Sequence, residues 1–215
     1  MHRYRIVCVT TLLIGMLSMS PVTLATIVTF DLRDNTVSSD LDGSQSGQLM
    51  NSGLGAIFTS LESEGTNSVF NHTSSSFGIN TLSTTLDSPS LIDGGAAWSE
   101  AVQLVFSELV YLREITLSSF TPLEWASLRV PGQPEWLLNG QSSARDRYSF
   151  ADILIPAGAS LVLSHVAGNG FSLDSFRVET SRVPEPSGFQ LMLLALGFLF
   201  LRRLFNFPAC SSADG

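Results

Sequence analysis

A succession of short segments rich in β-branched residues, separated by turn residues, fills the middle of this 215-residue chain and constrains its fold most. Polar and apolar side chains alternate along one of them, so Ile115 and Leu117 are predicted to share a buried face. Turns are predicted at residues 156–158 and 168–170. Strands are predicted at residues 27–32, 54–59, 102–106, 111–120, 126–130, 148–155, 160–166 and 171–180.

Short strands joined by turns predict an all-β fold, an antiparallel β-sandwich of the jelly-roll or Greek-key type, over residues 26–182. Residues 99–112 have partial helical spacing, but their β-branched content favours strands. Residues 62–76 are dominated by Ser, Thr, Asn, Gly and Glu, which predicts a loop.

The predicted domain is strongly acidic. All eleven cations of the chain are arginines, and seven of them fall within residues 26–182 beside 17 acidic residues, a formal charge of −10. Such a domain repels phosphate backbones, which argues against nucleic acid as a partner. Negative charge of this size keeps an exported domain soluble.

Lysine is absent from the whole chain and cysteine from the predicted domain, which excludes several kinds of catalytic and metal site. The chain has no lysine, which excludes a Walker-type phosphate loop, a Schiff-base lysine and a Ser-Lys dyad. Its two cysteines, Cys8 and Cys210, lie outside residues 26–182. The predicted domain therefore has neither a disulfide nor a cysteine zinc site, and depends on its core or on bound ions.

Residues 1–25 have the parts of a signal peptide. Arg3 and Arg5 make a positive start, residues 6–19 are apolar, and the segment ends in Ala25. We expect signal peptidase to cleave after Ala25, the alternative being an uncleaved membrane anchor.

A second apolar segment, residues 188–201, is predicted to form a transmembrane helix. It is short for a span, which needs about 20 residues, and snorkelling of the following Arg202 and Arg203 extends its reach. Arginines stay on the cytoplasmic side, so residues 204–215 are expected to be a cytoplasmic tail. The helix is preceded by a rigid, extended motif made of Val183, Pro184, Glu185 and Pro186.

Residues 183–203 resemble the PEP-CTERM sorting signal of Gram-negative bacteria, in which a Pro-Glu-Pro motif precedes a membrane helix and a basic cluster. The resemblance implies that the chain is an exosortase substrate. It would be tethered to the inner membrane with its domain in the periplasm, and then pass to the cell surface or extracellular matrix. The alternative is a plain C-terminal anchor.

A second resemblance lies inside the predicted domain. Residues 77–80, 87–89 and 91–95, followed by Glu100, are similar to a segment of exported PEP-CTERM proteins. In those proteins a Gly-Val/Ile-Asn turn precedes an Ile/Leu-Asp-Gly turn and a strand that begins near a glutamate. Residues 168–178 look like the last strand of the same domains, which leads into the sorting signal.

Four oxygen-bearing side chains of this region are candidate metal ligands. Hard cations such as Ca²⁺ take six to eight oxygens from carboxylates, amides and carbonyls, so a Ca²⁺ site would suit a domain without disulfides. The alternative is that these side chains only bond to backbone groups in turns, with no cofactor bound. The candidates are Asn80, Asp87, Asp93 and Glu100.

Exposed tryptophans on a sandwich could stack on sugar rings, although aromatic residues of such folds mostly pack in the core. Trp98, Trp125 and Trp136 are the candidates. Trp136 follows a Pro- and Gly-containing stretch, which predicts a position near a loop tip and makes it the best of the three.

No HExxH or Gly-x-Ser-x-Gly motif occurs, and no carboxylate pair stands out, so the chain is not expected to be an enzyme. The sequence predicts an exported, non-catalytic protein of the cell surface or extracellular matrix. The alternative is a carbohydrate- or calcium-binding module acting on extracellular polysaccharide.

Overall fold

The computed structural model describes residues 25–33, 39–63, 68–81, 87–95, 97–141 and 144–180, which belong to one compact unit, Ala25–Ser181. Ala25, at the predicted cleavage site, is exposed just before the first strand. The rest of the signal peptide, the sorting signal at 183–203 and the tail at 204–215 lie outside the described residues. Within the described residues, no helix has the length and apolar character that a membrane span requires.

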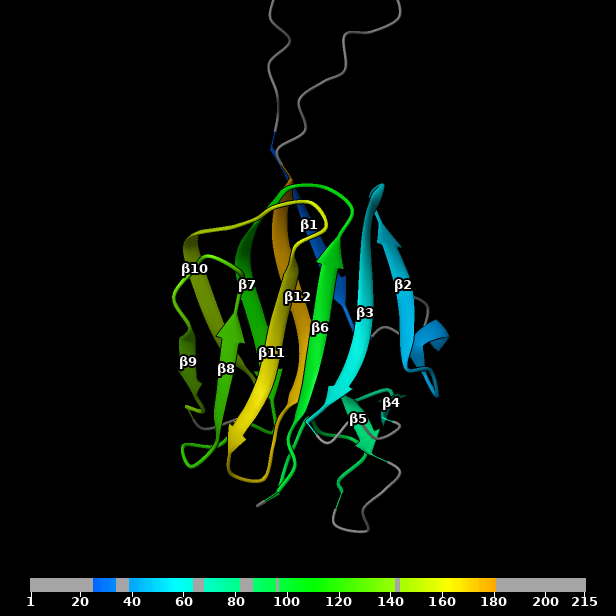
Figure 1. The fold of residues 1–215 in the computed structure, drawn as a ribbon, viewed down its shortest axis with the longest axis vertical. Coiled ribbons are helices and arrows are strands. Elements are labelled where there is room, and N and C mark those ends of the chain that lie inside the picture. Colours follow the sequence, from blue (N-terminus) through cyan, green and yellow to red (C-terminus); the bar gives the residue numbers. More distant parts are fainter. Residues whose placement is uncertain are drawn as a thin grey trace, which may run out of the picture. The chain divides into compact units, whose positions relative to one another are not determined.

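The described residues form twelve strands and one short 3₁₀ helix, η1 (Ser39–Leu41) (Figure 1). The strands are β1 (Thr26–Asp31), β2 (Ser46–Asn51), β3 (Leu54–Glu62), β4 (Ser68–His72), β5 (Phe77–Thr81), β6 (Glu100–Phe106), β7 (Val110–Ser118), β8 (Trp125–Arg129), β9 (Trp136–Asn139), β10 (Asp146–Ile155), β11 (Ser160–Ala167) and β12 (Ser172–Thr180).

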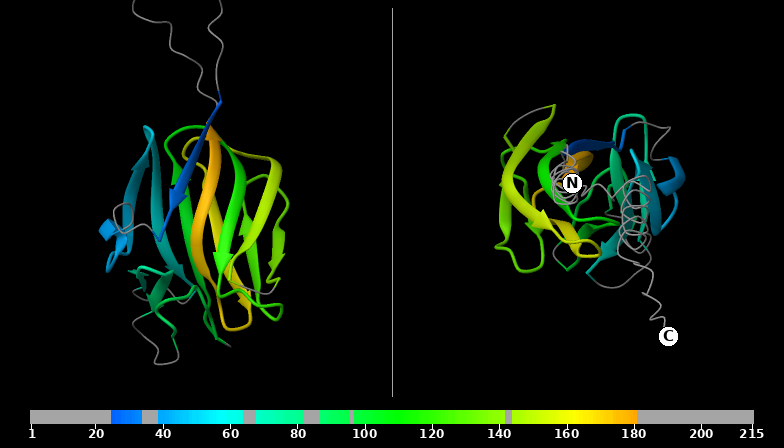
Figure 2. Two further views of the ribbon diagram at one scale, coloured as in Figure 1. Left: turned by 180° about the vertical axis from the view of Figure 1, so that it is seen from behind. Right: turned by 90° about the horizontal axis from the view of Figure 1, so that it is seen from above.

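The strands build two facing antiparallel sheets, as the sequence predicted. One has the order β1-β12-β7-β10 and lies in front in the left view of Figure 2, and the other has the order β2-β3-β6-β11-β8-β9. With β1, the strands from β6 to β12 make two four-stranded layers connected as in a jelly roll, and β2 and β3 extend the second layer. A separate hairpin, β4-β5, lies at one end (Figure 1).

Aromatic rings fill the space between the sheets. Phe176 on β12 stacks on Phe30 of β1, with ring centroids 4.8 Å apart. From the facing sheet, Phe58 and Phe106 approach Phe176 at 5.6 and 5.8 Å. These four side chains are almost completely buried, so the inner faces of both sheets meet in one dry core.

All eight predicted strands are present, and the preference for strands over a helix in residues 99–112 is confirmed. The predicted loop at 62–76 is wrong, because β4 lies within it and buries Phe70. The turn expected around Gly78 and Asn80 is wrong too, since both residues belong to β5. The edge strand β2 was not predicted, because it is mostly polar and buries little besides Leu49, so its sequence shows no alternation of polar and apolar residues.

Ile115 and Leu117 share the buried face, as predicted. Leu112 is also buried, although strict alternation would put it on the other face. The pairing of β7 with β12 shifts register between Arg177, opposite Glu114, and Val178, opposite Leu112. This β-bulge turns Leu112 inward.

Candidate metal centre

Backbone contacts hold the segment of residues 87–95, between β5 and β6, against the end of the sandwich. The Ile79 N–H donates to the Leu91 carbonyl at 2.9 Å. Ile92 forms a two-way bridge with Phe171, at 2.6 and 3.1 Å. A Cβ at Gly78 would lie 2.3 Å from the Leu91 nitrogen, so only glycine allows this close approach.

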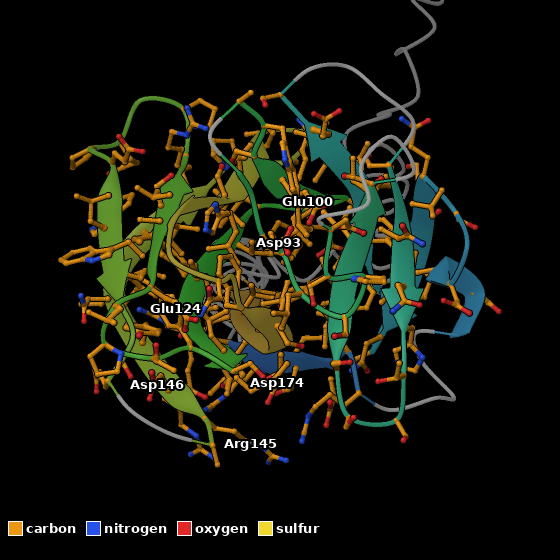
Figure 3. The ribbon with its side chains drawn as sticks, turned by 90° about the horizontal axis from the view of Figure 1, so that it is seen from below. Asp93, Glu100, Glu124, Arg145, Asp146 and Asp174 are labelled. Carbon is orange, nitrogen blue, oxygen red and sulfur yellow. The ribbon has the colours of Figure 1, made fainter. Side chains whose placement is uncertain are left out.

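This segment brings three predicted ligands together. Asp87 and Asp93 lie on it, and Glu100 is the first residue of β6. One carboxylate oxygen from each lies within 4.8 Å of the other two. Figure 3 shows Asp93 and Glu100 next to each other at this end of the molecule. We call these three residues the acidic trio.

Hydrogen bonds orient the acidic trio but leave part of it free. Glu100 accepts bonds on both oxygens, from the Thr81 hydroxyl at 2.5 Å and from the Asp93 N–H at 3.0 Å. One oxygen of Asp93 accepts the Ser88 N–H at 3.0 Å, and one of Asp87 accepts the Thr81 N–H at 3.2 Å. The second oxygen of Asp93, Oδ1, is buried and accepts no hydrogen bond from the described residues. Asp87 Oδ1 is also buried without a donor as long as Glu100 is ionised, whereas a protonated Glu100 can donate to the Asp87 carboxylate.

Burial makes the charged forms of the trio unfavourable. It raises the pKa of Glu100 to about 9, although the bonds from Thr81 and Asp93 oppose the shift. Burial likewise raises the pKa of Asp93 to about 6, and it raises the pKa of Asp87. Three carboxylates this close therefore need protons or a cation at neutral pH.

The geometry fits a hard cation. Two oxygens that each lie about 2.4 Å from one Ca²⁺ can be at most about 4.8 Å apart, and one carboxylate oxygen from each member of the trio lies within that distance of the other two. Asp93 Oδ1 is available as a ligand, and so is Asp87 Oδ1 once Glu100 has lost its proton. The turn bonds that the sequence offered as the alternative are also present, so the carboxylates can do both at once.

Asn80 does not fit the predicted set. It is on β5 directly before Thr81, whose hydroxyl points to Glu100. Because successive side chains of a strand point to opposite faces, the Asn80 side chain points away from the acidic trio.

Trp136 lies in a different place from the acidic trio. It is the first residue of β9, an edge strand, and directly follows the turn that connects β8 to β9. Trp136, Tyr148 and Phe150 line a cleft of about 570 Å³ between β9 and β10, and the rings of Trp136 and Phe150 meet edge to face at 6.5 Å. We call this the aromatic cleft.

The other aromatic candidates do not join this cleft. Trp125 begins β8 and is 39% exposed, and Trp98 lies against Gly95. The partners of Trp136 were missed, although the spacing of Tyr148 and Phe150 on one strand was a usable signal, because residues i and i+2 share a face.

No family model and no curated protein matches the chain. Among solved structures, the chain is similar to a Podospora anserina GH26-CBM35 β-(1,4)-mannanase, with 11% identity and a TM-score of 0.31. The match covers 75% of this chain and 29% of that one, so the chain spans less than a third of the mannanase. At this level the similarity carries no functional information.

In the presence of a chelator, we expect the melting temperature to fall as the pH rises from 4.5 towards 9. In that window the folded chain keeps protons on Asp93 and Glu100 that the unfolded chain has already released, so these two groups favour unfolding as the pH rises. His165, whose pKa is lowered by burial, acts in the opposite direction below about pH 6.5, so the fall is clearest above that pH. Calorimetry across this range measures the effect.

Glu100→Gln should flatten the upper part of this curve, because it removes the group that titrates highest. Asp40→Asn is the matched control at an exposed carboxylate and should keep the original slope. A melting temperature that rises with pH above about 6.5 in chelator would contradict the assignment of these protons.

Proposed function

We propose that this chain is an exported, non-catalytic protein of the cell surface or extracellular matrix, whose β-sandwich binds Ca²⁺ through the acidic trio. The Ca²⁺-binding part of this proposal rests on one observation. Asp93 Oδ1 is a buried carboxylate oxygen without a hydrogen-bond partner, and it belongs to a cluster of three carboxylates. A carboxylate in this setting is costly unless a proton or a cation compensates it.

Two features of the sequence support the proposal that the chain is exported. A leader of signal-peptide type precedes the domain, and the Pro-Glu-Pro motif, the apolar run, and Arg202 with Arg203 follow it. In this proposal signal peptidase removes the leader and the C-terminal helix tethers the domain on the periplasmic side. Exosortase then processes the sorting signal, and the domain reaches the surface.

Export and Ca²⁺ binding are physically compatible. Both cysteines lie outside residues 25–181, so no disulfide can stabilise the domain. Ca²⁺ at the acidic trio would link the 87–95 segment to β6, while Thr81 of β5 is hydrogen-bonded to Asp87 and Glu100. Extracellular modules bind Ca²⁺ with dissociation constants of roughly 10⁻⁴–10⁻³ M, which is enough for a structural role outside the cell.

Ca²⁺ should raise the melting temperature of the protein at neutral pH. At a free concentration about a hundredfold above the dissociation constant, binding adds about 2.7 kcal/mol to the free energy of unfolding. Asp93→Asn should abolish the shift, whereas Asp40→Asn should leave it unchanged. Titration calorimetry that detects no heat, together with an unchanged melting temperature, would refute Ca²⁺ binding.

Mass spectrometry of the protein from cells with and without exosortase tests the proposed export. We expect a mature N-terminus at Thr26, and a C-terminus shortened near residues 183–186 only where exosortase is present. A C-terminus at Gly215 in both strains would leave a simple membrane anchor instead of a sorting signal.

The aromatic cleft supports a second candidate function, binding of carbohydrate. Trp136, Tyr148 and Phe150 gather on one cleft at the open edge of the sandwich instead of being dispersed over its surface. Aromatic faces offer large apolar area to a sugar ring, and Gln141 at the rim can hydrogen-bond hydroxyl groups.

For this candidate, Trp136→Ala should weaken retention on a neutral polysaccharide by about fivefold or more, because the largest ring of the cleft is lost. Affinity electrophoresis measures the retention. Trp125→Ala, at a partly exposed tryptophan outside the cleft, is the control and should change nothing. Equal losses in both variants would argue against the cleft.

A further inference from the structure

Four of the seven arginines in residues 26–182 line one groove of about 340 Å³ on the four-stranded sheet. This is a local concentration of cations in a domain with a formal charge of −10. Three acidic residues share the groove, so its own charge is positive. The arginines are Arg33, Arg145, Arg147 and Arg177.

Strand register places two of these arginines, Arg147 and Arg177, in neighbouring rows across the outer face of the sheet. One row runs through Asp31, Ser175, Thr116 and Arg147, which are consecutive partners on β1, β12, β7 and β10. The next row holds Arg177, with Glu114 beside it. Side chains of such rows stand on one face, so the groove crosses the strands.

A β-bulge positions the end of the groove. The pairing of β12 with β7 shifts register between Leu173 and Ser175, so Asp174 is the extra residue. Its buried carboxylate accepts the Ser118 hydroxyl at 2.6 Å, and the Nε atoms of Arg33 and Arg145 lie 3.5 and 3.3 Å from its Oδ2. Figure 3 shows Asp174 and Arg145 on the same side of the molecule. Asp174 therefore anchors two of the four guanidinium groups at the groove.

Most of the donors of Arg147 and Arg177 remain available. Each guanidinium carries five N–H donors. Arg177 is paired through one contact of 3.4 Å with Glu114, and Arg147 forms no ion pair with any residue that the structure describes. Planar guanidinium groups bind carboxylates through two parallel hydrogen bonds, which makes carboxylates a well-matched ligand.

The groove adjoins the aromatic cleft. Arg147 lines both, while its neighbour on β10, Tyr148, lines the cleft beside Trp136. A ligand that crosses β10 would meet aromatic rings on one side and guanidinium groups on the other. A sugar chain that carries carboxylates has both matching features, whereas an acidic peptide uses only the second.

We propose that the four-stranded sheet binds an acidic polysaccharide, with Arg147 and Arg177 pairing with carboxylates of its uronate residues. The proposal does not depend on the acidic trio. It deepens the carbohydrate-binding candidate by naming the class of sugar, and it rests on that candidate for the contacts in the aromatic cleft.

The test is binding of the full chain, purified in detergent, to polygalacturonate. Its fully methyl-esterified form is the matched ligand, because it has the same backbone without the charges, and polyglutamate presents carboxylates on a peptide. We expect polygalacturonate to bind, the ester to bind at least tenfold more weakly, and binding to weaken in about 0.5 M salt.

Arg147→Gln and Arg177→Gln should each reduce polygalacturonate affinity by about tenfold, because each removes a charge-assisted pair. Neither residue forms an ion pair with Asp174 among the described residues, and the Arg177–Glu114 pair is long at 3.4 Å, so we expect the melting temperature to change little. Arg129→Gln, on the other sheet, removes the same charge and should leave the affinity unchanged.

Each other outcome overturns the proposal in a recognisable way. Equal binding of the ester, with no effect of the arginine variants but a loss in Trp136→Ala, would leave a site for neutral sugar. Polyglutamate binding as tightly as polygalacturonate would identify an acidic peptide as the ligand class. No binding of any polymer, with the Ca²⁺-dependent melting shift intact, would remove the sugar function and leave the proposed Ca²⁺ role standing.

Discussion

The contact of Phe176 with rings from both sheets is the interaction on which the rest of this structure depends. Its ring stacks on Phe30 within its own sheet and meets Phe58 and Phe106 of the other. A sandwich is stable only when the inner faces of both sheets interdigitate without water. Because side chains alternate along β12, the strand that points Phe176 inward must point Arg177 outward. The core therefore positions one side of the arginine groove.

Both polar sites lie where the regular pairing of strands is interrupted. A bulge at Asp174 directs a buried carboxylate to Ser118 and to two arginines. At the acidic trio, the irregular segment 87–95 forms backbone hydrogen bonds with neighbouring strands. These bonds bring Asp93 next to Glu100. Buried carboxylates are unfavourable unless they are paired, so a large apolar core is needed to tolerate them.

The domain carries three chemically different sites, one of them largely buried. Carboxylates concentrate between β5 and β6, aromatic rings line the edge between β9 and β10, and arginines gather on the outer face of the four-stranded sheet. The acidic remainder of the domain repels polyanions, so a carboxylated polymer would be attracted only where the arginines outnumber the acids. The proposed cation and polyanion sites would then not compete with each other in one small domain.

Alternation and turn residues are local signals, so the all-β class and eight of the strands could be predicted from the sequence. Three of the four side chains chosen as candidate metal ligands lie together in the structure, although the metal itself stays a proposal. The sequence could not predict that Asn80 points away from the trio, or that Tyr148 and Phe150 line one cleft with Trp136. These positions depend on the tertiary structure. It also brings arginines distant in sequence into one groove. The reason is that strand order and register join positions far apart in the chain, such as Arg177 and Glu114, 63 residues away, and no local pattern encodes that pairing.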